Sequence, residues 1–157
     1  MKTKTIAGIT AWLLFILYIA AMLYLLLFQR LISAGSLESL AEPDYAQAFL
    51  ARLELVPFRT IIEFIGLVET PTIGDLAFRN LVGNIVLFVP IGIFLPLLFR
   101  KQRSFRVFLP TTVLLICAVE ITQIVTLLGT CDVDDLILNT AGACAGYAVF
   151  RSFVRPQ

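Results

Sequence analysis

The sequence predicts an all-α integral membrane protein with four transmembrane helices and a short outer helix that is interfacial or re-entrant. Hydrophobic residues make up 59% of the 157 residues and the mean hydropathy is +0.94, whereas soluble domains are roughly 45–50% apolar. The chain also contains four long apolar runs, each close to the ~20 residues that a spanning helix needs. Because these runs use most of the chain, we expect a single membrane domain over residues 1–157.

Charged residues are sorted between the two ends of the apolar runs. One side carries eight basic residues and no acid, and the other carries ten of the eleven acids with only four arginines. Lys and Arg remain on the cytoplasmic side during membrane insertion. The sequence therefore predicts a multi-pass protein with both termini in the cytoplasm. The basic side consists of Lys2, Lys4, Arg100, Lys101, Arg103, Arg106, Arg151 and Arg155.

The first span is expected at residues 6–28, a run without any charged residue. It is longer than the apolar core of about 7–15 residues in a cleaved secretory signal. Small residues at 33–35 leave cleavage open as an alternative, but an anchored first helix fits the length better.

Residues 29–80 form the predicted outer loop. Within it, residues 56–65 are too short to cross the membrane and carry Arg59 and Glu63. This pattern is typical of an interfacial or re-entrant helix that begins at Pro57. Arg59 and Glu63 are spaced to form a weak surface ion pair on that helix.

Three further spans are expected at residues 81–99, 107–128 and 136–153. Pro90 and Pro96 should kink the inner half of the second span and free carbonyl groups near Val86, which neighbouring helices must then cover. In the fourth span, Gly142 and Gly146 permit a close helix contact, either within the monomer or between two copies.

Polar side chains lie in the outer half of three predicted spans. Glu120 and Gln123 share a face of the third span, while Asn84 and Asn139 lie near the outer ends of the second and fourth. Such residues can act simply as hydrogen bonds between helices. An ionisable side chain at membrane depth is costly and commonly functional, however. We therefore expect one outward-opening pocket, with Glu120 and Gln123 as its floor and the two asparagines as its walls.

The acidic turn Asp132-Val133-Asp134-Asp135 permits two interpretations. Asp132 can cap the fourth helix while Asp134 and Asp135 interact with its positive N-terminus. Alternatively, the three carboxylates and Asn139 could offer oxygen ligands to Mg²⁺ or Ca²⁺. The spacing matches no EF-hand loop, so we assign no metal and no cofactor.

Composition excludes several classes of chemistry. The chain has no histidine and three cysteines, so triads, metal sites and proton relays that use histidine are ruled out. The placement of the cysteines gives neither a disulfide nor a zinc framework. Nucleic-acid binding is not expected, because the basic residues form short clusters beside the membrane, where they could contact anionic headgroups.

Four segments in sequence order resemble the signature of the VanZ-like membrane proteins. Each segment is weak alone, but the four with this spacing are specific, and the resemblance extends from the first span to Tyr147. The segments are Leu55-Val56-Pro57-Phe58, Asn84-Ile85-Val86-Leu87-Phe88-Val89-Pro90-Ile91-Gly92, Glu120-Ile121-Thr122-Gln123 and Asp132-Val133-Asp134-Asp135-Leu136-Ile137-Leu138-Asn139-Thr140-Ala141-Gly142.

The resemblance implies a protein of the bacterial cell membrane, in a family associated with resistance to teicoplanin, a glycopeptide with a lipid tail. It departs from the pattern at Ala143, where many relatives have a second glycine. The characteristic polar positions of the family fall on Asn84, Glu120, Gln123, Asp132, Asp135 and Asn139.

The leading hypothesis is a non-enzymatic protein that binds an amphipathic ligand, such as a lipid headgroup, a lipid-tailed glycopeptide or a lipid-linked cell-wall precursor. One alternative is a membrane-embedded enzyme acting on a lipid-linked envelope substrate, with Glu120 as acid–base and the acidic turn holding a metal. Another is a small transporter with Glu120 as proton carrier. In the leading hypothesis, Arg59 would meet a phosphate or carboxylate group of the ligand. The predicted ligand-binding residues are Arg59, Asn84, Glu120, Gln123, Asp132, Asp135 and Asn139.

Overall fold

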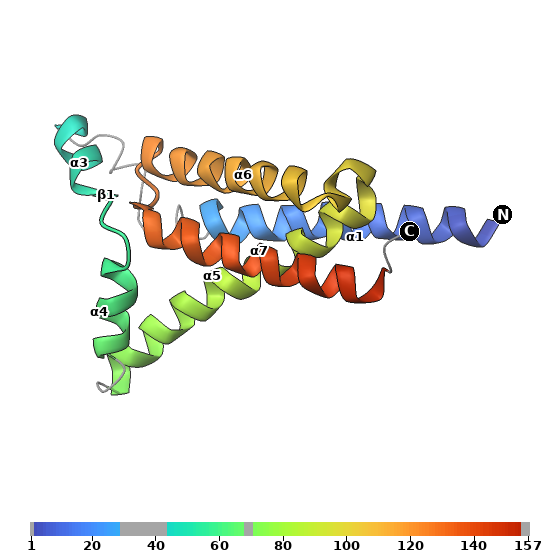
Figure 1. Cartoon of the computed structure of the whole chain (residues 1–157). Helices are drawn as coiled ribbons and strands as arrows, with labels where there is room; N and C mark the ends of the chain where they lie inside the picture. The colour runs from blue at the N-terminus through green and yellow to red at the C-terminus, as the bar shows by residue number, and fades with distance from the viewer. Residues whose placement is uncertain (1, 29–43, 68–70, 155–157) are drawn as a thin grey trace.

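The computed structural model describes residues 2–28, 44–67 and 71–154, which are almost entirely helical (Figure 1). This confirms the predicted all-α class, to which two short strands are added. The elements are α1 (Lys2–Leu23), the π-helical turn η1 (Tyr24–Phe28), α3 (Tyr45–Ala51), β1 (Leu53–Glu54), α4 (Arg59–Leu67), α5 (Pro71–Leu98), the 3-10 turn η3 (Arg100–Arg103), α6 (Phe105–Val125), β2 (Cys131–Asp132) and α7 (Val133–Phe153).

Three of the described helices are long and apolar enough to cross a membrane, over Gly8–Leu27, Leu81–Leu98 and Phe105–Val125. The fourth predicted span, α7, has 21 residues but is not among them. Its sequence begins with acids and continues with small residues, many of which are buried against other helices. A helix face that packs against other helices presents less surface to lipid and needs fewer large apolar side chains. Four spans therefore stay a prediction.

The arrangement of the helices is consistent with an even number of passages through the membrane. In Figure 1, α6 and α7 run side by side along the bundle, and the start of α1 lies at the same end as the end of α7. The opposite end carries α3 and α4, with α4 lying across the direction of α6 and α7. We call this end the outer end, following the charge-based prediction of orientation.

The predicted outer loop contains more helix than expected. The short outer helix is present as α4, and α5 starts at Pro71, ten residues before the predicted start of the second span. The apolar part of α5 begins at Leu81, as predicted. The hydropathy pattern located the part of the helix that suits lipid, but not the polar turns that precede it.

The closest helix contact joins α5 and α7, where glycines replace side chains at the interface. A Cβ atom on Gly142 would overlap the carbonyl oxygen of Ile85, and one on Gly146 would overlap that of Val89. In the other direction, a Cβ atom on Gly92 would meet the backbone of Ala143. The predicted close contact through Gly142 and Gly146 is therefore made within the monomer.

The two prolines lie inside α5, which continues as one helix through both. Two carbonyl groups of α5 near the prolines accept hydrogen bonds from other parts of the chain, but they are not the ones at Val86 and Gly92 that the prolines themselves free. The Tyr18 hydroxyl of α1 donates to the carbonyl oxygen of Leu87 at 2.7 Å. At the inner end, Arg103 Nε donates to the Pro96 carbonyl oxygen at 3.2 Å, which ties the basic loop to α5.

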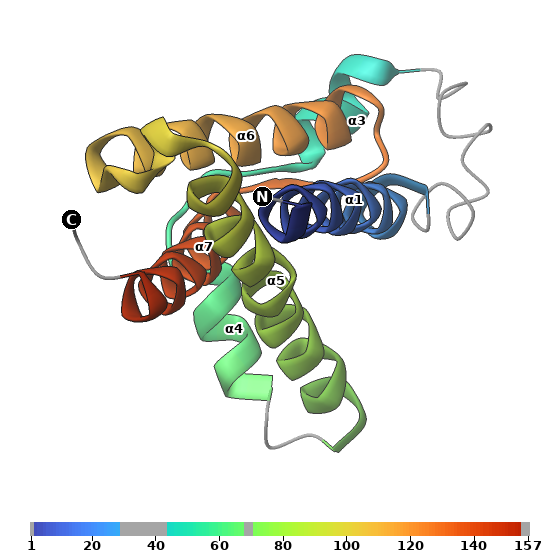
Figure 2. The same cartoon turned by 90° about the vertical axis from the view of Figure 1, so that its right-hand side faces the viewer.

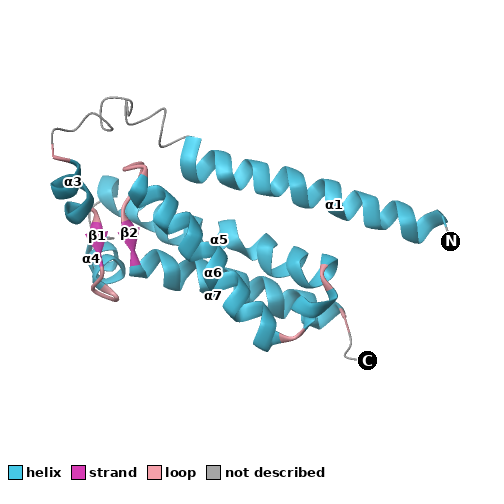
Figure 3. Cartoon of the chain, turned by 90° about the horizontal axis from the view of Figure 1, so that it is seen from above, coloured by secondary structure: helices cyan, strands magenta, loops and turns pink. Residues whose placement is uncertain are grey.

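The first helix lies at the edge of the structure. Figure 3 shows α1 beside the group formed by α5, α6 and α7, and most of its side chains are exposed. Aromatic contacts attach its inner half to α5, including Trp12 with Phe99 at 5.4 Å between ring centroids. Phe15 also packs against Phe94 at 5.7 Å. The exposed apolar side chains of α1 suit a surface that contacts lipid.

Candidate functional site

Asp134 joins the outer helix α4 to the start of α7. Its side chain is completely buried and accepts hydrogen bonds from the backbone N–H groups of Phe58, at 2.5 Å, and Ile61, at 3.0 Å. These are donors at the N-terminus of α4, which have no partner inside that helix. Phe58 has a positive φ of 64°, uncommon for a bulky residue. The carboxylate therefore holds a strained helix start in place.

The sequence prediction for Asp134 was incomplete, because neither the interaction with its own helix N-terminus nor the cation site placed it against α4. The residues before α4, Leu55 to Phe58, include no side chain that can accept a hydrogen bond. A helix start without its own cap requires an acceptor from elsewhere. That absence is a signal in the sequence, but it does not identify which acid supplies the acceptor.

Backbone pairing also attaches the residues before α4 to the outer end of the bundle. Strands β1 and β2 are parallel, with Leu53 opposite Cys131 and Glu54 opposite Asp132. The Tyr45 hydroxyl donates to the carbonyl oxygen of Val125 at 2.8 Å. Two of the four family-like segments, around Pro57 and around Asp134, are thus neighbours in the fold.

The remaining acids of the turn have separate partners. Asp132 caps α7 by accepting from the Asp134 N–H at 2.8 Å, which confirms the predicted cap. The Asn84 side chain donates to the Asp135 carboxylate, so α5 and α7 are connected at the outer end. Within the described residues, no group of three or more acids or cysteines is arranged to hold a metal ion. The geometry favours the cap over the cation site.

A substitution series at Asp132 tests this interpretation. Asp132→Asn keeps an acceptor for the Asp134 N–H, so we expect nearly unchanged thermal stability in detergent. Asp132→Ala removes the acceptor and should cost about 1 kcal/mol. EDTA should leave the melting temperature of the wild type unchanged. A melting shift caused by EDTA and reversed by Mg²⁺ or Ca²⁺ would contradict the cap interpretation and support the enzyme alternative.

Gln123 connects α6 with the first helix. The side chain is 1% exposed, and its amide Nε2 donates to the carbonyl oxygen of Leu26, in the π-helical turn η1, at 3.1 Å. Single π-helical turns are frequent at functional sites. The donor group of Gln123 is thus used inside the protein, and this residue positions α1 against α6.

Glu120 is buried one turn deeper on α6, with 6% of its surface exposed. In the outer turn, burial raises the pKa of the Cys131 thiol, and the neighbouring acidic groups Glu120, Cys117 and Asp132 raise it further. A thiol with a raised pKa stays protonated at neutral pH and is a poor nucleophile. The carboxylate, rather than the cysteine, is therefore the candidate chemical group at this end.

Asn139 lies on α7 and is 3% exposed. Its Oδ1 atom has no hydrogen-bond donor among the described residues. The buried Thr112 hydroxyl of α6 likewise has no hydrogen-bond partner among them. Leaving a buried acceptor without a donor costs about 1–3 kcal/mol. Asn139 is therefore a candidate to accept from a bound water molecule or a ligand group.

Arg59 lies on the exposed surface of α4 in an ion-pair group with two acids. Its Nε donates to Glu63 and its NH1 to Glu54, each at 3.1 Å. The hydrogen bond to Glu63, followed by the charges of Glu54 and Glu63, raises the pKa of Arg59. The predicted Arg59/Glu63 pair is confirmed, and Glu54 is a partner that the sequence did not reveal.

The seven predicted site residues thus fall into several contact groups. Asn84 and Asp135 are in direct contact, and Asp132 is next to them on the same turn. Gln123 contacts α1, and Arg59 pairs with acids on the outer surface. A single polar pocket with Glu120 as its floor stays a prediction.

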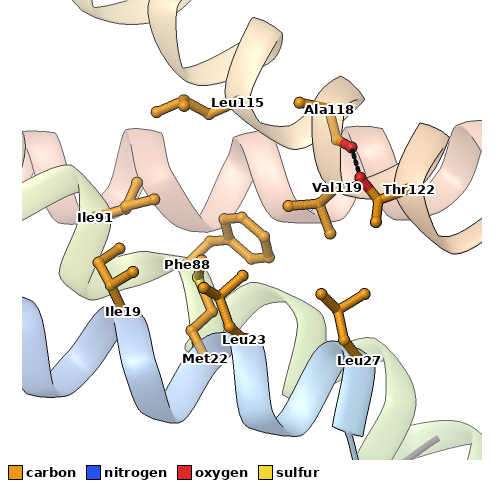
Figure 4. A pocket seen from close by; sticks show the side chains of 10 residues that line it. All are labelled: Ile19, Met22, Leu23, Leu27, Phe88, Ile91, Leu115, Ala118, Val119 and Thr122. Atoms are coloured by element: carbon orange, nitrogen blue, oxygen red, sulfur yellow. Dashed lines mark hydrogen bonds between the residues drawn. The ribbon is translucent and has the colours of Figure 1, made fainter. Parts of the chain in front are cut away.

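A cavity of about 270 Å³ lies elsewhere, between α1, α5 and α6 (Figure 4). None of the seven predicted residues lines it, and hydropathy alone could not reveal it, because it depends on how three apolar helices pack. Its lining consists of Ile19, Met22, Leu23, Leu27, Phe88, Ile91, Leu115, Ala118, Val119 and Thr122.

The sequence profile described as VanZ/LLP1 matches residues 15–154. The chain belongs to the VanZ/LLP1 family. It is also similar to Protein VanZ of Enterococcus faecium, with 30% identity over 81 residues that cover 52% of this chain and 50% of that protein. The match thus spans about half the length of this curated relative. No solved structure matches the chain significantly. The resemblance seen in the four segments is confirmed.

Proposed function

We propose that this VanZ/LLP1 protein binds an amphipathic ligand in the outer half of the membrane and thereby contributes to glycopeptide tolerance. The ligand would be a lipid or a lipid-tailed glycopeptide such as teicoplanin. Family membership supports the association with teicoplanin resistance. The protein would reside in the bacterial plasma membrane with both termini in the cytoplasm, as the sorting of charge predicts.

The observation that carries the proposal is the buried carboxylate of Glu120 within a candidate span, Phe105–Val125. Ionisable groups at membrane depth are costly and usually retained for function. Asn139, on the neighbouring helix α7, adds a buried carbonyl oxygen with no donor among the described residues. Together they offer an acid and an amide to the polar part of a ligand, and Asn84, Asp132 and Asp135 would complete its surroundings.

Glu120→Gln tests the proposal, because it keeps the size of the side chain and removes the charge. We expect the variant to accumulate normally but to lose teicoplanin tolerance in a sensitive host and the lipid that co-purifies with the wild type. The matched control is Asp44→Asn, the same loss of a carboxylate charge at an exposed position of the outer segment, which should behave as wild type. Tolerance would be measured as the minimum inhibitory concentration and lipid by mass spectrometry.

The opposite pattern would show that Glu120 is structural. If Glu120→Gln retains tolerance and lipid while Glu120→Leu fails to accumulate, the residue serves only as a hydrogen bond between helices. The ligand site would then have to be sought elsewhere.

A further inference from the structure

We infer that the cavity between α1, α5 and α6 binds one hydrocarbon chain of a membrane amphiphile, and that it is the apolar half of the ligand site. The assignment of the chain to a ligand of this protein rests on the proposed function. The existence of the chain site rests on the cavity itself.

The lining of the cavity suits a hydrocarbon and little else. All three helices that form it contain candidate spans, so the surroundings are lipid rather than water. The lining side chains are apolar except for Thr122, whose hydroxyl donates to the carbonyl oxygen of Ala118 at 2.7 Å (Figure 4). The one hydrogen-bond donor among the lining side chains is therefore already used. A methylene chain in an apolar space of this kind gains dispersion contacts with the side chains around it.

The size of the cavity limits its occupant to part of a molecule. Sites for complete small ligands measure roughly 300–1,000 Å³, and this cavity, at about 270 Å³, is slightly smaller. A phospholipid or a glycopeptide is too large to enter as a whole. One acyl chain can enter from the side of the bundle while the polar group stays outside.

Two hydrogen bonds hold α1 on either side of the cavity. Tyr18 of α1 bonds to the Leu87 carbonyl oxygen of α5, and Gln123 of α6 bonds to the Leu26 carbonyl oxygen of η1. The lining residues Ile19 and Leu23 lie between these two points in the sequence. The space is therefore a built feature of the fold rather than a gap beside a loosely attached helix.

The position of the cavity also predicts the direction of the chain. Figure 4 shows Leu27 and Thr122 at the same end of the cavity, and Leu115 toward the other. Thr122 lies near the outer end of α6, so this end of the cavity is its outer end. An amphiphile with its chain directed inward would place its polar group there, in the outer half of the membrane.

Photolabelling tests the inference on the full-length protein in detergent. The probe is a phosphatidylglycerol with a diazirine in one acyl chain, followed by peptide mapping. We expect saturable labelling of residues 19–27 of α1 and η1 and of residues 115–122 of α6. Ala118→Phe fills the cavity and should reduce labelling there to the level found on exposed residues of α7, whereas Ala148→Phe, on the exposed side of α7, should not. Ala118→Leu repeats the test if the phenylalanine variant does not accumulate.

Competitors identify the source of the chain. Competition by unlabelled phosphatidylglycerol alone would assign the site to a membrane lipid, and competition by teicoplanin would assign it to the glycopeptide tail; either supports a chain site. Labelling that does not saturate and is equal on all lipid-exposed faces would overturn the inference. Loss of tolerance in Glu120→Gln with no saturable labelling would leave the proposed function standing without a chain site. Saturable labelling together with unchanged tolerance in Glu120→Gln would support the chain site and contradict the proposed function.

Discussion

Gly146→Leu will prevent the protein from accumulating, whereas Ala145→Leu, on the exposed side of the same helix, will be tolerated. A Cβ atom at Gly146 would overlap the carbonyl oxygen of Val89. This neighbour is helix backbone, so it cannot move aside as the end of a flexible side chain can. Even Gly146→Ala should cost about 1–3 kcal/mol, the usual cost of overpacking, because α5 would have to move away from α7.

Movement at this position would affect the whole interface. Gly92 and Gly142 make equally close contacts between the same two helices, so separating α5 from α7 at one glycine loosens the others. Accumulation would be followed by fluorescence-detected size-exclusion chromatography, and stability by thermal unfolding in detergent. If Gly146→Leu and Ala145→Leu accumulate equally, the close approach of α5 and α7 is wrong.

Hydropathy and charge predict the apolar helices well, because lipid imposes a simple rule on every exposed side chain. Residues 81–98 and 105–125 qualify as spans close to the predicted limits. The rule is less informative for α7, which packs one face of small residues closely against α5. Its small residues signal the close contact with α5, but the identity of the partner helix comes only from the structure.

The candidate site is less predictable because its contacts join residues far apart in the sequence. Composition singles out Glu120 as an isolated acid in an apolar run, and the structure buries it. Composition cannot reveal that the Gln123 amide donates to Leu26 in η1, or that Arg59 has Glu54 as a second acidic partner. These contacts depend on how the outer segment folds back onto the bundle, which no local periodicity specifies.

Asp134→Ala will detach the start of α4 from the bundle. The substitution removes the acceptor of two backbone N–H groups, those of Phe58 and Ile61. A hydrogen bond to a charged group contributes about 1.5–3 kcal/mol, so the loss of both should destabilise this end by about 3 kcal/mol or more. The positive φ of Phe58 adds to the effect, because the Phe58 N–H would lose the carboxylate that holds this conformation.

Limited proteolysis would measure the detachment directly. Trypsin should cleave after Arg52 and Arg59 faster in Asp134→Ala than in the wild type, while the apolar helices stay protected by detergent. Asp134→Asn keeps one acceptor oxygen and places an amide against the other N–H, so its cleavage rate should be intermediate. Asp132→Ala is the control for loss of a cap on α7 alone and should leave cleavage at Arg59 nearly unchanged. Equal rates in Asp134→Ala and the wild type would show that the Asp134 contacts do not hold α4. A faster rate confined to Asp134 variants would mean that the two family-like segments around Pro57 and Asp134 act as one unit, which fixes the outer helix above the end of the bundle where Glu120 is buried.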